Sequence, residues 1–221
     1  MGIIFLSQWI KAIAKKIIFF FVEPRCRYCE RLLSSYDIAF CLSCLDKIQF
    51  LAPIMHRKKY PLYALGYYDG ILRFIVTEKY RQQRLSYYAL FDKIVSLIDF
   101  YAIDFDVVVP IPKTTRNMFS QKVNPPALIA EFIAQKFKKT LFSEVYITKY
   151  KNNQSGQSHA ARVKMEEDAF FIPLSSQSAL LNKKILLIDD VATSGRTIDV
   201  MIHQLSKIKS SSMSVFVIAR K

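Results

Sequence analysis

The stretch that decides the fold is Lys184-Ile185-Leu186-Leu187-Ile188-Asp189-Asp190-Val191-Ala192-Thr193-Ser194-Gly195-Arg196-Thr197. It opens with a continuous apolar run, which is typical of a strand buried on both faces. Two adjacent carboxylates follow, and then a loop of small, hydroxylated residues around one glycine. Residues 198–208 space their apolar side chains as a helix does. A strand, an acidic pair, a loop and a helix in this order predict an α/β fold.

The loop at 192–197 has the composition of an anion-binding loop. Backbone N–H groups at a helix N-terminus can donate to a phosphate, and threonine and serine hydroxyls can donate as well. Gly195 permits a backbone turn that a Cβ would resist. The loop has no Gly-Lys-Ser/Thr sequence, so it is not a Walker A loop. We therefore predict a phosphate site of another kind.

The acidic pair needs a separate explanation, because carboxylates do not bind phosphate directly. Neighbouring side chains of a regular strand point to opposite faces, so Asp189 and Asp190 can reach one ligand only if the strand ends between them. We expect the strand to end there. Vicinal sugar hydroxyls and Mg²⁺ both suit such a pair. A sugar phosphate fits the whole stretch, with its phosphate in the loop and its ribose on the carboxylates.

The same order of residues resembles the phosphoribosyl pyrophosphate (PRPP) signature of the type I phosphoribosyltransferases. The resemblance implies a mostly parallel sheet flanked by helices, with PRPP and Mg²⁺ as ligands. It also implies the PRPP-binding residues of this stretch, which are Asp189, Asp190, Val191, Ala192, Thr193, Ser194, Gly195, Arg196 and Thr197.

All four cysteines lie close together near the N-terminus, as Cys26, Cys29, Cys41 and Cys44. Two C-x-x-C pairs at this separation can deliver four thiolates to a tetrahedral Zn²⁺. Their clustering favours a local metal site over a disulfide framework. Since the protein fills all four ligand positions, we predict a structural zinc that supplies much of the folding energy of a small module.

The zinc module and the α/β domain together resemble the ComF family of competence proteins over residues 20–221. The matching motifs are Tyr68-Asp69-Gly70-Ile71-Leu72-Arg73, Glu78-Lys79-Tyr80, Val109-Pro110-Ile111-Pro112 with Arg116, and Gln154-Ser155-Gly156 with Arg162. Two segments depart from the family. Its R-G-F-N-Q segment is Gln121-Lys122-Val123-Asn124-Pro125 here, and Met165 stands where Asn is usual.

The resemblance implies a reaction in which attack at ribose C1 expels pyrophosphate. On this basis Lys79, Tyr80 and Arg81 are further PRPP-binding residues, and Lys79 is a catalytic candidate together with Asp189 and Asp190. Lys113 and Arg116 are additional candidates for the pyrophosphate. The polar loop at 154–162, which contains His159, is expected to close over the site.

Two functions compete at this point. One is a competence protein that handles incoming single-stranded DNA in the cytoplasm and carries a PRPP/Mg²⁺-binding domain. The alternative is a phosphoribosyltransferase with an unidentified acceptor and no direct DNA role. A net charge of +14 favours polyanionic partners, although a generally basic protein would show it too. Cations alternate with aromatic residues at 25–28, 57–60 and 79–81, a pattern suited to single-stranded DNA. Other DNA-uptake proteins are expected partners.

We predict three segments. Residues 1–22 form a basic amphipathic helix, residues 23–60 the zinc module and a linker, and residues 61–221 the phosphoribosyltransferase-like domain. The first helix either docks on the protein or lies on a membrane surface, because its longest apolar run is too short to span a bilayer. We expect a cytoplasmic protein, with peripheral contact at the inner face of the membrane as the alternative.

Periodicity and breakers predict the remaining elements. The expected helices are 71–78, 85–101 and 125–137, and the expected strands are 63–68, 107–112, 144–150 and 213–219.

Overall fold

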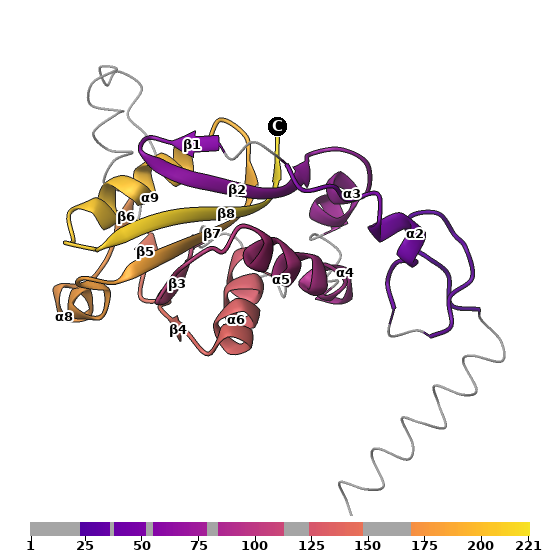
Figure 1. The fold of residues 1–221 in the computed structure, drawn as a ribbon, viewed down its shortest axis with the longest axis horizontal. Coiled ribbons are helices and arrows are strands. Elements are labelled where there is room, and N and C mark those ends of the chain that lie inside the picture. Colours follow the sequence, from indigo (N-terminus) through magenta and orange to yellow (C-terminus); the bar gives the residue numbers. More distant parts are fainter. Residues whose placement is uncertain (1–22, 36–37, 52–54, 79–83, 113–123, 148–168) are drawn as a thin grey trace, which may run out of the picture. The chain divides into compact units, whose positions relative to one another are not determined.

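The computed structural model describes residues 23–35, 38–51, 55–78, 84–112, 124–147 and 169–221 (Figure 1). The predicted helix at 1–22 and the polar loop at 154–162 lie outside this part of the chain. The chain divides into two compact units, Met1–Lys47 and Ile48–Lys221. Among the described residues, no helix has both the length and the apolar character needed to cross a membrane.

A six-stranded sheet in the order β1-β2-β8-β7-β3-β4 forms the larger unit (Figure 1). All neighbouring strands are parallel except the β1–β2 pair, so the mostly parallel α/β sheet is confirmed. A separate antiparallel pair, β5 and β6, lies outside this sheet. The strands are β1 (Met55–Arg57), β2 (Tyr60–Tyr67), β3 (Val107–Pro110), β4 (Thr140–Leu141), β5 (Tyr146–Ile147), β6 (Phe170–Phe171), β7 (Lys184–Ala192) and β8 (Ser212–Arg220).

The helices after β2 connect these strands, whereas α2 (Leu42–Leu45) belongs to the N-terminal unit. The others are α3 (Gly70–Glu78), α4 (Arg84–Tyr88), α5 (Phe91–Phe100), α6 (Pro125–Phe137), α8 (Leu174–Gln177) with the short 3₁₀ helix η3 (Ser178–Leu180), and α9 (Arg196–Ser206). The helices predicted at 71–78 and 125–137 are confirmed. The one predicted at 85–101 is divided, because the Leu90 N–H bonds to the Tyr87 carbonyl three residues back, at 3.0 Å, and fully buried Leu90 anchors the break.

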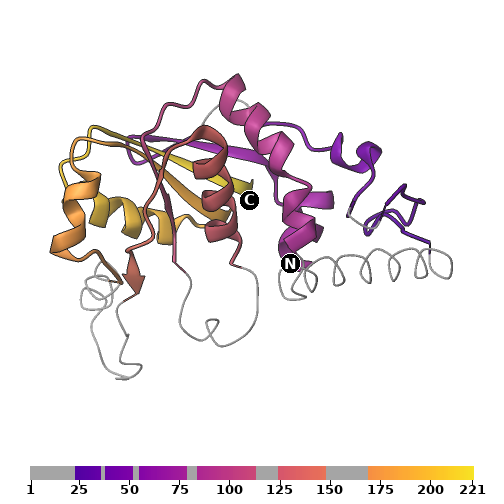
Figure 2. The ribbon, with the colours of Figure 1, turned by 90° about the horizontal axis from the view of Figure 1, so that it is seen from below.

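The apolar run of β7 is buried on both faces, as predicted. Ile185 and Leu187 belong to the core cluster that includes the apolar side of α9. Leu186 and Ile188 alternate with them and point to the other face, where α6 packs against β7. Figure 2, which views the molecule from below, shows α6 and α9 as separate helices beside the strands of the sheet. Strand β7 is therefore central, with a helix packed on each of its faces.

The predicted end of this strand is wrong. β7 does not stop between Asp189 and Asp190 but continues to Ala192, because β8 stays paired with it as far as the Ala192–Arg220 pair. It is β3 that ends, at Pro110 opposite Ile188, and its chain then leaves the sheet towards Pro112, which has no N–H to donate. Among the described residues, the acidic pair thus lies where β7 has lost one of its two neighbours.

The predicted linker also differs from the structure. Residues 55–60 form β1, a tight turn and the start of β2, and Arg57 pairs with Tyr60 across the turn at Lys58 in the β1–β2 hairpin. Lys58 has φ +54°, in the left-handed region that such a tight turn requires. The hairpin adds an edge strand to the main sheet, so this segment is part of the larger unit. The predicted strand at 144–150 is represented by β5, and residues 148–150 lie outside the described part.

Candidate functional site

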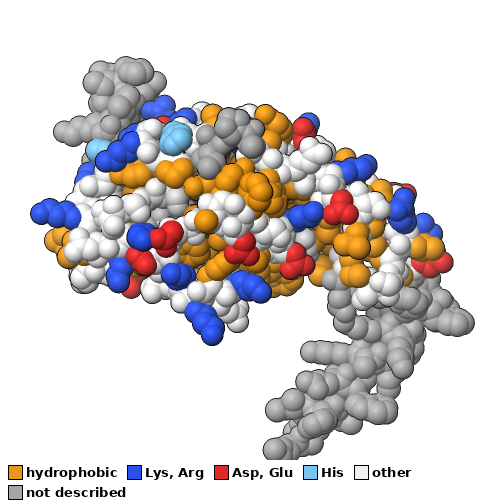
Figure 3. All heavy atoms as spheres, in the orientation of Figure 1, with side chains coloured by type: hydrophobic (Ala, Val, Ile, Leu, Met, Phe, Trp, Pro, Cys, Tyr) orange, Lys and Arg blue, Asp and Glu red, His pale blue; other side chains and the backbone are white. Residues whose placement is uncertain are grey.

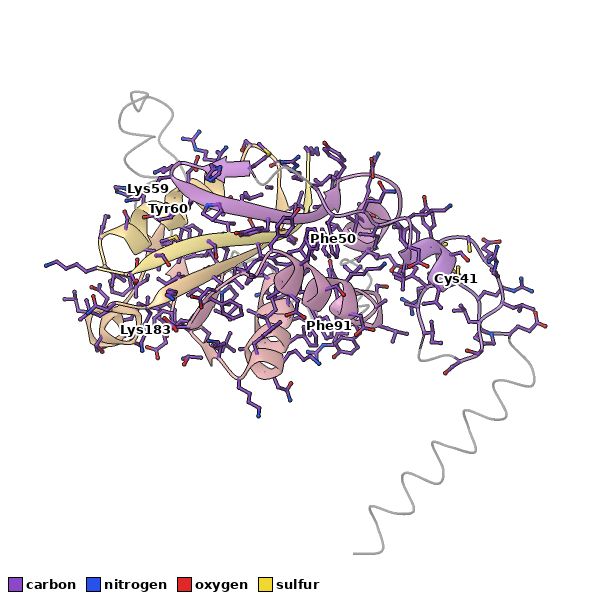
Figure 4. All side chains as sticks on the ribbon, viewed as in Figure 1. Cys41, Phe50, Lys59, Tyr60, Phe91 and Lys183 are labelled. Atoms are coloured by element: carbon purple, nitrogen blue, oxygen red, sulfur yellow. The ribbon has the colours of Figure 1, made fainter. Side chains whose placement is uncertain are left out.

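The four cysteines form one cluster in the N-terminal unit, where Figure 4 labels Cys41. Their sulfur atoms all lie within 4.8 Å of one another. The Cys26–Cys44 and Cys29–Cys41 Sγ separations are 3.9 and 3.6 Å. A tetrahedral zinc with Zn–S bonds of about 2.3 Å requires sulfur atoms roughly 3.8 Å apart. The cluster therefore has the dimensions of a four-thiolate metal site.

Local backbone structure places these sulfurs. The Glu30 N–H donates to the Cys26 carbonyl at 2.8 Å and closes the first C-x-x-C turn. Cys41 precedes α2 and Cys44 lies within it, so the start of this short helix delivers the second pair. The Cys41 N–H donates to Cys26 Sγ at 3.4 Å. Both knuckles therefore turn their thiols towards the same point.

Without a metal, the pKa values of two of these thiols shift in opposite directions. Burial raises the pKa of Cys26, but backbone N–H groups from Cys41, Cys29 and Tyr28 donate to its sulfur and bring that pKa down to about 6. Burial also raises the pKa of Cys44, and the neighbouring cysteines, with a thiolate on Cys26, raise it further. A divalent cation would let all four thiols ionise together. The residues present therefore fit a metal ion.

The loop between β7 and α9 ends in a left-handed glycine at the start of the helix. Gly195 adopts φ +71° and ψ +10° directly before α9, a left-handed conformation that favours glycine. The Asp199 N–H donates to the Gly195 carbonyl at 2.9 Å and closes the first helical turn. Thr193, Ser194 and Thr197 are exposed, so their hydroxyls are accessible to a ligand.

The two carboxylates lie on either side of β7. Asp189 follows Leu187 on the face that α9 covers, and Asp190 follows Ile188 on the opposite face. Both residues are half-buried. The Asp190 N–H donates to Asp189 Oδ1 at 2.8 Å, and the Val191 N–H donates to Asp190 Oδ1 at 3.0 Å. Each carboxylate is thus oriented by the backbone of the next residue, beside the start of the loop.

The structure adds a residue that sequence reasoning did not place at this site. Arg57 of β1 donates from Nε to Asp199 Oδ1 at 2.7 Å and from Nη2 to Asp199 Oδ2 at 2.6 Å. Its Nη2 also donates to the Ser194 carbonyl at 2.5 Å. Arg57 is 142 positions from Asp199, so no local pattern could have linked them.

The other predicted ligand residues lie outside the described part of the chain. They are Lys79, Tyr80, Arg81, Lys113, Arg116 and His159. Glu78, directly before Lys79, is 9% exposed and accepts a hydrogen bond from the Ser86 hydroxyl at 2.6 Å. The end of α3 is therefore anchored by this contact, immediately before the three predicted PRPP-binding residues.

Comparison with known families gives one match, over less than half of the chain. Residues 127–221 match the model of the phosphoribosyl transferase domain. These residues include most of α6 and all of β7, the loop, α9 and β8. No curated protein matches the chain.

Several solved structures are similar at low sequence identity. A glutamine PRPP amidotransferase from B. subtilis is 15% identical, with a TM-score of 0.38, over 52% of this chain and 23% of its own. A hypoxanthine phosphoribosyltransferase from Staphylococcus aureus is 16% identical, with a TM-score of 0.33, over 60% of this chain and 61% of its own. The hypoxanthine phosphoribosyl transferase of Trypanosoma cruzi is 10% identical, with a TM-score of 0.35, over 78% and 71%. The chain thus spans about a quarter of the amidotransferase and less than two thirds of the S. aureus enzyme.

Proposed function

We propose that the larger unit binds PRPP with Mg²⁺ at the carboxyl end of β7 and transfers its phosphoribosyl group to an acceptor. The observation that carries this proposal is the β7–loop–α9 geometry: a left-handed Gly195 directly before α9, with exposed hydroxyls in the loop and an acidic pair just ahead of it. The match of residues 127–221 to the phosphoribosyl transferase domain supports the same proposal. Ligands of parallel sheets bind at this end of the strands.

The loop would bind the 5′-phosphate of PRPP. Its backbone N–H groups and the hydroxyls of Thr193, Ser194 and Thr197 are donors, and the partial positive charge at the start of α9 favours an anion. The backbone at the end of the loop already has its helical start, with Gly195 in the left-handed region directly before α9. A phosphate can therefore be held without a lysine in the loop.

Asp189 and Asp190 would bind the ribose, although β7 continues past them and their carboxylates lie on opposite faces. Since β3 ends at Pro110, β7 has an open edge beside the pair within the described part of the chain, and a ribose at this edge can be reached from both faces. The 2′- and 3′-hydroxyls of the sugar donate to the carboxylates, and the negative charge of the pair keeps phosphate groups away from this position. Substrate orientation follows, because the 5′-phosphate can occupy only the loop side. The same carboxylates suit Mg²⁺, which when bound neutralises charge on the departing pyrophosphate.

The chemical step is a substitution at ribose C1. A nucleophilic atom of the acceptor forms a bond to C1, while the bond from C1 to the pyrophosphate oxygen breaks and that oxygen keeps the electron pair. We assign Lys79 and Arg81 to the pyrophosphate, which they would neutralise as it leaves.

Calorimetry with PRPP tests the binding proposal directly. We expect saturable binding that requires Mg²⁺, with ribose 5-phosphate as a weaker ligand because it lacks the pyrophosphate. A pyrophosphate-release assay, run with nucleobases or single-stranded DNA as acceptors, then tests transfer. An absence of PRPP binding in the presence of Mg²⁺ would contradict the proposal, while binding without pyrophosphate release would restrict the function to ligand recognition.

A second proposal is that the protein handles single-stranded DNA, as a competence protein would, together with other DNA-uptake proteins. Two features favour it. Tyr28 is 38% exposed on the cysteine-containing unit, and the amino group of exposed Lys59 lies over the ring of partly buried Tyr60 at 5.3 Å. Arg57 is not available for this role, because Asp199 and Ser194 hold it. On the face drawn in Figure 3, cations are interspersed with acidic side chains and form no continuous patch.

Fluorescence anisotropy with labelled single-stranded oligonucleotides decides this second proposal. We expect binding without strong sequence preference, weakening with salt by about 0.7 in the log–log slope per phosphate contacted. Replacement of Lys58 and Lys59 by alanine should weaken binding, whereas Lys207→Ala, which removes an exposed cation from the end of α9, should not. No saturable binding at about 100 mM salt would rule out the DNA role.

A further inference from the structure

Arg57 connects an edge strand to the proposed phosphate loop. Its guanidinium makes a two-pronged ion pair with Asp199 in α9, and it donates to the Ser194 carbonyl within the loop. The side chains of Arg57 and Asp199 are only 33% and 30% exposed, so the contact is partly shielded from water. Two points of the loop–helix junction are therefore held by one side chain from the β1–β2 hairpin.

The bond to the Ser194 carbonyl sets the direction of a loop donor. In a trans peptide unit the C=O and the following N–H point in opposite directions. Because the Ser194 carbonyl faces Arg57, the Gly195 N–H points away from it. That N–H is one of the donors at the start of α9, so Arg57 directs a donor without needing to touch the ligand.

The ion pair also changes the charge at the start of α9. Asp199 lies in the first turn of the helix, where its negative charge would repel a phosphate bound at the same end. The guanidinium of Arg57 cancels that charge at hydrogen-bond distance. The partial positive charge at the N-terminus of α9 is then available to the phosphate.

Gly195 is matched to this arrangement. A Cβ at Gly195 would lie 2.5 Å from Arg57 Cζ and 2.7 Å from its Nε, closer than such atoms approach. The guanidinium thus packs directly against the glycine backbone. Gly195 is needed for its φ of +71° and also for the space that Arg57 occupies.

We propose that Arg57 is a positioning residue that holds residues 193–197 in their phosphate-binding conformation. The proposal deepens the proposed PRPP function and rests on it. Loss of Arg57 would let the loop sample other conformations, and the apparent dissociation constant rises as the binding-competent fraction falls. The strand that carries Arg57 contributes no ligand-binding group of its own in this scheme.

The test compares Arg57→Ala and Arg57→Lys with the wild type in two measurements. One is PRPP affinity by calorimetry with Mg²⁺, and the other is amide hydrogen exchange of residues 193–199 without ligand. We expect Arg57→Ala to weaken binding by about tenfold, which corresponds to a competent fraction of roughly a tenth. Exchange in the loop should accelerate while exchange in β7 and β8 stays unchanged. Arg57→Lys, which keeps the charge but not the planar fork, should recover part of both effects.

Two controls separate positioning from general stability. Lys207→Ala removes one exposed cation from the other end of α9 and should change neither measurement. In Arg57→Ala, the negative charge of Asp199 is no longer cancelled and would repel the phosphate. Adding Asp199→Asn removes that charge, so the double variant should bind PRPP at least as well as Arg57→Ala alone. If exchange instead accelerates equally through the loop and the sheet, Arg57 has a general structural role and the proposal is wrong.

The outcomes also distinguish this proposal from the PRPP proposal. If the wild type binds PRPP but Arg57→Ala binds equally well with unchanged loop exchange, the positioning role is overturned and the PRPP site stands. If the wild type does not bind PRPP, the proposed function fails, and the exchange of residues 193–199 still decides whether Arg57 orders the loop.

Discussion

Removal of metal from the four-cysteine cluster is expected to unfold the N-terminal unit and leave the sheet of the larger unit intact. The described residues of this unit, 23–35 and 38–47, contain one four-residue helix and few buried apolar side chains. A segment of this size does not form a stable core without a metal or a disulfide. Structural zinc contributes roughly 10–16 kcal/mol of apparent binding free energy at neutral pH, which is enough to account for its folding.

The measurement combines metal analysis with hydrogen exchange before and after chelation. Purified protein should contain one zinc per chain, and Cys44→Ser should lose it. Ser34→Ala, at an exposed position of the same unit, is the matched control and should retain the metal. A protein that contains well under one equivalent of zinc after expression with zinc supplied would show that the cluster is not a zinc site.

Replacement of both carboxylates, as Asp189→Asn with Asp190→Asn, is expected to abolish most of the affinity for PRPP. Each charge-assisted hydrogen bond to the ribose contributes about 1.5–3 kcal/mol, so the pair should lower affinity by about a hundredfold or more. Asparagine is the right replacement because its amide oxygen can still accept from the N–H groups of Asp190 and Val191. The loop should therefore keep its conformation while the charges are lost.

Calorimetry with PRPP and Mg²⁺ measures this effect. The control is Asp104→Asn, which removes a carboxylate that forms an exposed ion pair with Lys184 at the other end of β7. In the wild type, the hydrogen bond and charge of Lys184 lower the pKa of Asp104, so the control removes a carboxylate that is ionised at neutral pH. Equal affinity in the wild type and the double variant would show that the acidic pair is not the ribose site.

Several features followed from the sequence because their causes are local. The unbroken apolar run at 185–188 predicts a strand buried on both faces, and β7 is central. Two prolines favour a helix start at 125–137, since their missing N–H groups are not needed there. The spacing of the cysteines brings their sulfurs within 4.8 Å of one another. In each case the residues that decide the structure are close together in the chain.

Only the tertiary structure decided where β7 ends and that the segment before β2 is a strand of the sheet. Whether β7 stops at its acidic pair depends on its neighbours: β8 continues to Arg220 and keeps pairing, while β3 ends at Pro110. The start of the β1–β2 hairpin resembled a linker because its three consecutive basic residues are untypical of a strand. This strand is stabilised by pairing with the sheet, which the local sequence does not show.

The contact between Arg57 and the loop has the same kind of origin. A solvated cation and a bound one look identical in sequence, and Arg57 meets Asp199 only because the strand order places the hairpin beside β8. The sequence by itself determined the central strand, the glycine turn before α9 and the cysteine cluster, through periodicity, backbone preference and spacing. The extent of β7 and the partner of Arg57 were decided by pairing between distant segments, which no local pattern encodes.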